Sequence, residues 1–166
     1  MCDLDSLTGG ACGQNNPPGI RTKLKFIPAE ELTNHPPLLD NGTPGASNIL
    51  AEKFAYVPDV GKGYWRVLDI MVDTGELTVS TAGDPGSLAI LNSLNFMVVG
   101  LGPAQKEFAQ KAVNCCLVVA VLDRANKDHY HIIGRFDDPA HITEIGGGTG
   151  VKVGDKRGLS YKIADT

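Results

Sequence analysis

Short apolar segments that end at turn residues are the feature of this sequence that most restricts its fold. Residues 103–114 have apolar side chains at helical spacing, and Pro103 stands where a first-turn proline is common. The other apolar segments have the length of strands and are interrupted by glycine and proline, which occur 20 and 10 times in 166 residues. This pattern favours a single β-rich domain with one helix.

The clearest predicted strand is IRTKLKF, residues 20–26, because apolar and basic side chains alternate along it. Its predicted outer face consists of Arg21, Lys23 and Lys25, which we also expect to contribute to a subunit interface. About eight or nine strands are predicted in all. Besides residues 20–26, they lie within residues 48–57, 63–72, 76–80, the second half of 87–99, 116–123, 129–134, 142–145 and 159–164.

Two segments lack strand or helix periodicity. Residues 1–19 are expected to form an N-terminal arm, followed by one domain over residues 20–166. Within that domain, residues 28–47 form a predicted long loop with four prolines. Loops of this length are uncommon in compact domains and are often functional. We expect this loop to pack on a neighbouring subunit, because a monomer would leave its apolar anchors exposed: Leu32, Leu38 and Leu39.

Charge and hydropathy make several classes of protein improbable. The net charge of -4 provides no basic surface for a nucleic-acid backbone, so nucleic-acid binding is not expected as the main task. The longest apolar run, Cys115 to Leu122, is far shorter than a membrane span, and no export signal begins the sequence. These features predict a protein that is made and folded in a cytoplasm without contacting a membrane.

Two glycine-rich segments resemble nucleotide-binding motifs only in part. Gly100 and Gly102 match the first two glycines of a dinucleotide fingerprint, but Gln105 takes the third place and a hairpin is predicted after Asp123. Residues 144–158 lack the order of a Walker motif. We therefore predict a turn at the first segment, a loop at the second, and no nucleotide cofactor.

Other candidate reactive residues also favour a non-catalytic protein. His129 and His131 share a predicted strand face near His141, but no carboxylate pattern completes a metal site. Cys115 and Cys116 are expected to be small buried residues with reduced thiols. Cys2 and Cys12 are also expected to be reduced, although the sequence does not exclude that they pair. We predict no catalytic residue, metal ion or cofactor.

Two regions together resemble a known family. CDLDSLTGGACGQNNPPGIRTKLKF at the start is similar to the beginning of major tail tube proteins of tailed bacteriophages with Bacteroidetes hosts. LVVAVLDRANKDHYHIIG and TGVKVGDKRGLSYKI are similar to their strand, turn and strand segments near the end. The resemblance covers about half of the chain and does not extend to residues 28–86.

The resemblance implies a β-sandwich or rolled barrel with one flanking helix, a fold shared with the tube protein of type VI secretion. It implies a virion protein without catalytic activity, whose hexameric rings stack into the tail tube through which DNA is ejected. Expected partners are further copies of the chain and other tail proteins, such as the tape measure, terminator, sheath or baseplate, while DNA only passes through the lumen. The alternatives are a head-tail connector, a capsid decoration protein, or a small nucleotide-binding or metal-dependent enzyme.

Overall fold

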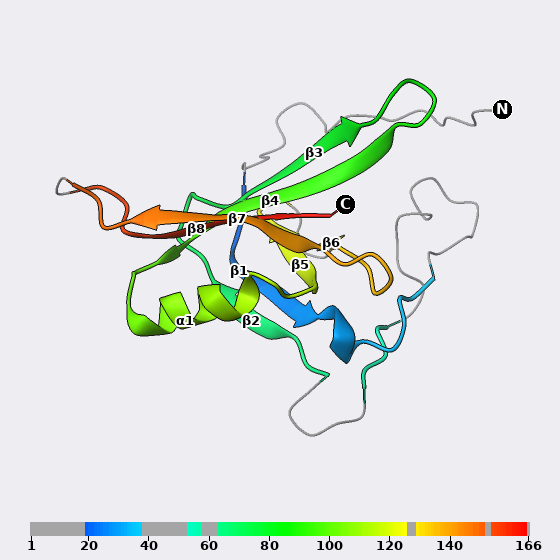
Figure 1. Cartoon of the computed structure of the whole chain (residues 1–166), viewed down its shortest axis with the longest axis horizontal. Helices are drawn as coiled ribbons and strands as arrows, with labels where there is room; N and C mark the ends of the chain where they lie inside the picture. The colour runs from blue at the N-terminus through cyan, green and yellow to red at the C-terminus, as the bar shows by residue number, and fades with distance from the viewer. Residues whose placement is uncertain (1–18, 38–52, 58–62, 126–128, 152–153, 166) are drawn as a thin grey trace.

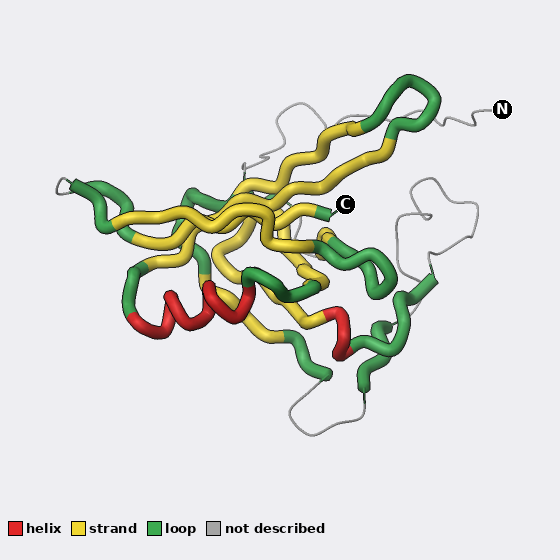
Figure 2. Tube along the Cα trace, in the orientation of Figure 1, coloured by secondary structure: helices red, strands yellow, loops and turns green. Residues whose placement is uncertain are grey.

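The computed structural model describes residues 19–37, 53–57, 63–125, 129–151 and 154–165. In this part of the chain, two four-stranded antiparallel sheets pack face to face, with one α-helix alongside them (Figures 1 and 2). The prediction of a mainly β fold with one helix is confirmed, and the described strands form no closed barrel. Apart from Gly19, the predicted arm lies outside the described residues, as do Leu38 and Leu39.

The strands enter the two sheets in pairs along the sequence. The first sheet has the order β2-β1-β5-β6, with β1 at Ile20–Pro28, β2 at Arg66–Asp69, β5 at Leu117–Asp123 and β6 at Tyr130–Ile133. The second has the order β3-β4-β8-β7, with β3 at Glu76–Ala82, β4 at Ala89–Val99, β7 at His141–Gly148 and β8 at Gly158–Ala164. A short 3-10 helix, η1, follows β1 at Ala29–Glu31.

The main core lies between the sheets because alternate residues of each strand point inward. Leu24 of β1 and Val119 of β5 face Leu94 of β4 and Ile163 of β8 in one buried cluster. Leu94 and Val119 are completely buried. The alternation predicted for residues 20–26 therefore places Leu24 in the core, as expected.

The helix α1, Pro103–Ala112, confirms the helix predicted from residue 103. It begins directly after Gly102, with Pro103 in its first turn, where the missing N–H breaks no helical hydrogen bond. Phe108 and Ala112 face the sandwich from α1. Among the described residues, no helix is long and apolar enough to cross a membrane.

Strand β5 is buried on both faces, which explains its uninterrupted apolar sequence. On the side away from the main core, Val118 packs with Ile27 of β1 and with Ala29 and Leu32, which follow that strand. This outer cluster is completed by the partly buried side chains of Phe54, Trp65 and Ile132. The chain after β1 thus covers the back of the first sheet.

Two predicted strands and one predicted loop are wrong in their extent. Residues 53–57 contribute to pairing through a single bridge from Tyr56 to Leu32, and of residues 63–72 only Arg66–Asp69 form a strand. Conversely, Gly146 to Gly148 belong to strand β7 rather than to a loop. Glycine is required at Gly147, where φ is +153° and a Cβ atom would lie 2.4 Å from the carbonyl oxygen of Gly158.

Candidate subunit interface

The hairpin formed by β3 and β4 projects beyond the body of the sandwich (Figures 1 and 2). Every residue from Thr81 to Ile90 is exposed. At the tip, the Ser87 N–H donates to the carbonyl oxygen of Asp84, at 2.9 Å. Gly83 and Gly86 adopt positive φ angles there, of +108° and +101°, which glycine tolerates without strain.

One face of this hairpin carries apolar side chains that are exposed in the described part of the chain. Leu77 of β3 pairs with the buried Leu94 of β4, so their side chains lie on the same face of the sheet. Val79 is separated from Leu77 by an even number of residues, as Ile90 is from Leu94, so both lie on that face too. Val79 is 65% exposed and Ile90 68% exposed, whereas Leu94 is fully buried. Leu88, just before β4, is 59% exposed. The core face of the second sheet therefore continues past the point where the first sheet ends.

The base of the hairpin is held by Asp165, which follows β8. The backbone N–H and the side-chain amide of Asn92 both donate to its carboxylate, the latter at 2.7 Å. The Asp165 N–H in turn donates to the Asn92 carbonyl oxygen at 3.2 Å. These contacts fix where β4 separates from β8 and becomes half of the free hairpin.

A wide groove of about 980 Å³ lies at the foot of the exposed face. Val79 and Asn92 line it on the hairpin side, and Asp123 and Tyr130 line it on the side of the first sheet. The remaining lining residues include charged and polar side chains, among them Glu76, His129, His131, Arg135 and Asp165. Apolar and polar side chains are thus mixed along the groove, as they are at many protein–protein interfaces.

Both sheets also end in strands whose outer edges are unpaired among the described residues. In the second sheet, β3 pairs with β4 alone and β7 pairs with β8 alone. Such edges present unpaired N–H and C=O groups that can accept a strand from another chain. The apolar face and the free edge of β3 belong to the same hairpin.

The basic face predicted on β1 is present but is partly engaged within the chain. Lys23 is exposed and lies opposite Asp69 of β2, while Arg21 is half-buried. The Lys25 ammonium lies 4.8 Å from the centre of the Tyr130 ring, within range of a cation-π interaction. Their predicted role in a subunit interface stays a prediction.

The expectation that Leu32 would be exposed in a monomer is wrong. Its side chain is 2% exposed and belongs to the outer cluster. The adjacent Glu31 carboxylate accepts two hydrogen bonds from the Arg66 guanidinium, at 2.7 and 3.2 Å, and one from the Gly63 N–H at 2.9 Å. The beginning of the predicted loop, residues 28–37, is thus attached to its own domain.

The glycines of the dinucleotide-like motif lie in the turn between β4 and α1. Gly100 has a φ angle of +93°, and the side chain of Gln105 packs beside both Gly100 and Gly102. The strand after the helix, β5, belongs to the other sheet, so no parallel strand-helix-strand unit is built here. A direct test is titration with NAD and NADP, for which we expect no saturable binding at millimolar ligand.

The candidate histidines and cysteines lie in different parts of the described structure. His129 and His131 line the groove, while His141 begins β7. In the described part of the chain, no three His, Cys, Asp or Glu residues are arranged to hold a metal ion. Cys115 is half-buried and Cys116 is exposed, both as free thiols, so the expectation that both are buried is wrong for Cys116.

His35 gives the outer cluster a pH dependence. Its ring packs edge-on against Phe54, with centroids 5.8 Å apart, and its Nδ1 atom is buried without a hydrogen-bond partner among the described residues. Burial lowers the pKa of His35, the charge of Arg135 lowers it further, and Asp137 opposes the change. Because the pKa is lower in the folded state, this contribution to stability is complete above about pH 6.5 and is lost as the pH falls through the folded-state pKa.

We therefore expect His35→Gln to reduce the loss of stability between pH 7.5 and pH 5.5. Urea denaturation of both proteins at the two pH values measures this difference. An identical pH dependence in the His35 variant and the unmodified protein would contradict the assignment.

Sequence patterns do not mark the residues of the exposed hairpin face as a site. The available signal is the Gly-Asp-Pro-Gly turn at residues 83–86 between two segments with alternating apolar residues, which is typical of a hairpin. Comparison of the chain with protein-family models, curated proteins and solved structures gave no match. The function is therefore inferred from the sequence and from the geometry of this surface.

Proposed function

We propose that this protein is the subunit of a phage tail tube, a virion protein that assembles into stacked, hexameric rings and forms the conduit for DNA ejection. The observation that carries the proposal is the projecting β3–β4 hairpin, whose apolar face is exposed in the single chain. The terminal resemblance to tail tube proteins supports the same function. A hairpin of this kind is costly in a monomer and is explained if a second copy covers it.

The free edges of the second sheet support assembly into a ring. Strand β3 is one edge and β7 is the other, so a neighbouring copy can add its edge to either side. Contacts between two different surfaces of identical subunits close into a ring when the rotation between subunits permits it, and otherwise continue as a filament. In this proposal the hairpins join around the ring, and the net negative charge avoids trapping the DNA that passes through.

The test is the double substitution Val79→Lys and Ile90→Lys. Covering the exposed two thirds of a valine and an isoleucine contributes about 2 to 4 kcal/mol at each subunit contact, and two lysines replace that contribution with a desolvation cost. We expect the unmodified protein to form rings or tubes in negative-stain electron micrographs and the double variant to sediment as a monomer. Its thermal unfolding should remain close to that of unmodified protein, because both positions are already exposed.

Ser80→Lys is the matched control, because Ser80 is exposed on the opposite face of the same strand. This variant should assemble normally. The proposal would be refuted by an unmodified protein that remains monomeric at high concentration. Rings formed equally well by the double variant would instead show that the hairpin face is not the contact.

A further inference from the structure

The tip of the β3–β4 hairpin contains one of the two Asp-Pro peptide bonds of this sequence, between Asp84 and Pro85. The other joins Asp138 to Pro139, in the connection between β6 and β7. An aspartate side chain usually cyclises onto the N–H of the next residue, but proline has no N–H. The remaining five-membered ring joins a carboxylate oxygen to the carbonyl carbon of the same aspartate, and closing this ring breaks the chain.

Ser87 places two hydrogen-bond donors on the carbonyl oxygen of the Asp84–Pro85 bond. The Ser87 N–H donates to the Asp84 carbonyl oxygen at 2.9 Å, and the Ser87 hydroxyl donates to the same oxygen at 3.4 Å. Such donors draw electrons from the carbonyl carbon and stabilise the negative charge that the oxygen acquires when a nucleophile adds. The turn therefore makes this carbonyl carbon more reactive than it is in an unfolded chain.

The hairpin tip also leaves room for the reaction. Every residue from Thr81 to Ile90 is exposed, so water reaches both sides of the bond. Asp84 is the only ionisable residue within residues 77–105, so no second charged side chain of the hairpin competes for its carboxylate. A Cβ atom added at Gly86 would meet no atom within 4 Å, so the chain beyond the bond can move away once the bond opens.

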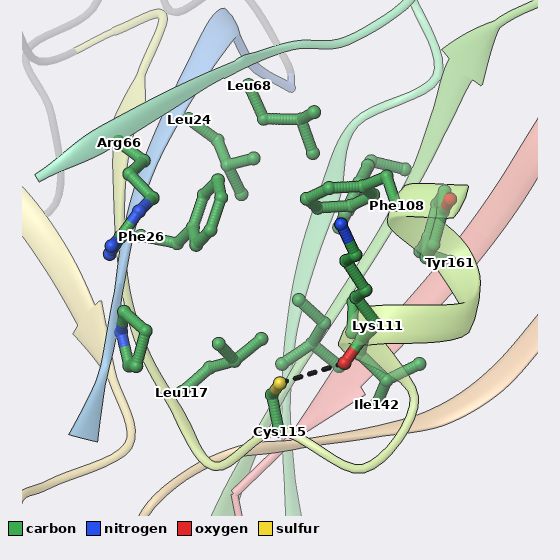
Figure 3. A pocket seen from close by; sticks show the side chains of 14 residues that line it. Leu24, Phe26, Arg66, Leu68, Phe108, Lys111, Cys115, Leu117, Ile142 and Tyr161 are labelled. Carbon is green, nitrogen blue, oxygen red and sulfur yellow. Dashed lines mark hydrogen bonds between the residues drawn. The ribbon is translucent and has the colours of Figure 1, made fainter. Parts of the chain in front are cut away.

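The second Asp-Pro bond is an internal comparison, because the chain beyond it is anchored. The Asp138 carbonyl oxygen accepts one hydrogen bond, from the Arg135 N–H at 2.7 Å. Ala140, which follows Pro139, is fully buried and exchanges two backbone hydrogen bonds of 2.9 Å with Leu117. Leu117 is also buried, and it lines an apolar cavity of about 220 Å³ beside α1 (Figure 3). The proline nitrogen therefore stays beside the carbonyl carbon when this bond opens, and the bond re-forms.

We propose that the Asp84–Pro85 bond is a self-cleavage site, at which the chain hydrolyses its own backbone in mild acid. A carboxylate oxygen of Asp84 adds to the Asp84 carbonyl carbon, whose oxygen takes the negative charge and accepts the Ser87 hydrogen bonds. The bond from this carbon to the Pro85 nitrogen then breaks, and the nitrogen takes a proton from the solvent and leaves as a secondary amine. Water opens the cyclic anhydride that remains, so one water molecule is consumed and Asp84 ends with two carboxyl groups.

Cleavage at this bond leaves the sandwich assembled. Strands β3 and β4 stay paired over seven residue pairs, from Glu76 and Asn95 to Ala82 and Ala89. Residues 1–84 and residues 85–166 each contribute strands to both sheets, so the two fragments remain associated. The closed tip of the hairpin becomes two free ends. This inference concerns the single chain and does not rest on the proposed assembly.

The test follows both Asp-Pro bonds by mass spectrometry, at the lowest pH at which circular dichroism shows the unmodified protein to be folded. We expect fragments 1–84 and 85–166, in material that still elutes with the uncleaved protein in size-exclusion chromatography. Cleavage of Asp84–Pro85 should be faster than that of Asp138–Pro139 by roughly 10-fold or more. In urea at the same pH, the two rates should become nearly equal, because unfolding removes both the Ser87 donors and the anchor at Ala140.

Two variants at exposed positions test the chemistry. Asp84→Glu keeps the charge but requires a larger ring, so cleavage after residue 84 should slow by about 10-fold or more, with no change at Asp138–Pro139. Ser87→Ala removes one of the two donors and should slow cleavage by roughly 2- to 10-fold. No cleavage at Asp84–Pro85, equal rates at the two bonds in the folded protein, or an unchanged rate in either variant would each overturn the proposal.

Discussion

Leu32→Ala should lower the free energy of unfolding of the isolated chain by about 3 kcal/mol, within the range of roughly 2 to 5 kcal/mol for buried leucines. Leu32 is 2% exposed and packs with Ile27, Ala29 and Val118 behind the first sheet. Removing its side chain leaves a cavity there, because β5 cannot move toward it without disturbing the main core. Guanidinium denaturation of the monomer measures the change.

Leu88→Ala is the matched control because it removes the same atoms from a side chain that is 59% exposed. Its free energy of unfolding should change by less than about 0.5 kcal/mol. If Leu32→Ala were equally harmless to the monomer and prevented only assembly, Leu32 would belong to an interface after all.

Arg66→Met should destabilise the chain by roughly 2 to 4 kcal/mol. The guanidinium makes two hydrogen bonds to the Glu31 carboxylate, whose side chain is 6% exposed. Methionine retains much of the apolar stem and removes the charge-assisted hydrogen bonds, so the change measures mainly the electrostatic contact. The expected loss stays below the upper range for buried pairs because the Arg66 side chain is 28% exposed.

Lys111→Met is the control for charge, because it breaks the exposed ion pair between Lys111 and Glu107. Screening by water makes such pairs weak, and we expect an unchanged denaturation midpoint. A double-mutant cycle with Glu31→Gln isolates the pairwise energy of Glu31 and Arg66. A coupling energy near zero would show that the contact between Glu31 and Arg66 does not stabilise the fold.

The elements with strong periodicity could be predicted from the sequence. Alternation locates β1, the uninterrupted apolar run locates β5, and Pro103 with its apolar stripe locates α1. In each of these elements, the apolar side chains are spaced so that they fall on the faces that the fold buries. Neither the assignment of strands to two sheets nor their order follows from spacing, because pairing joins segments far apart in the chain.

The errors arise where tertiary contacts override local preference. Tyr56 and Trp65 have high strand propensity, but they share a hydrogen bond from the Trp65 indole to the Tyr56 hydroxyl, at 2.9 Å, rather than a strand ladder. Gly146 to Gly148 have no side chains to give a period, yet pairing with β8 makes them a strand. Leu32 lies in a segment without strand or helix periodicity, so no sequence pattern indicates that its side chain is buried.

The exposed hairpin face is also beyond sequence analysis, although the turn at residues 83–86 has a clear signal. Val79 alternates with polar neighbours just as a core residue does, and its exposure depends on where the first sheet ends. Sequence spacing gives the face of a strand that a residue occupies. It does not give the length of the layer packed against that face.

The place of β8 in the second sheet has a consequence for the time at which this chain can fold. Strand β8 comes last among the described strands, yet it lies between β4 and β7 and pairs with both. During synthesis, β4 and β7 therefore cannot acquire their shared neighbour until residues 158–164 have left the ribosome. Strand β7 is close to β8 in sequence, whereas the pairing of β4 with β8 joins segments far apart and therefore forms slowly. The unpaired edge of β4 thus stays open to other chains until translation of every described strand is finished.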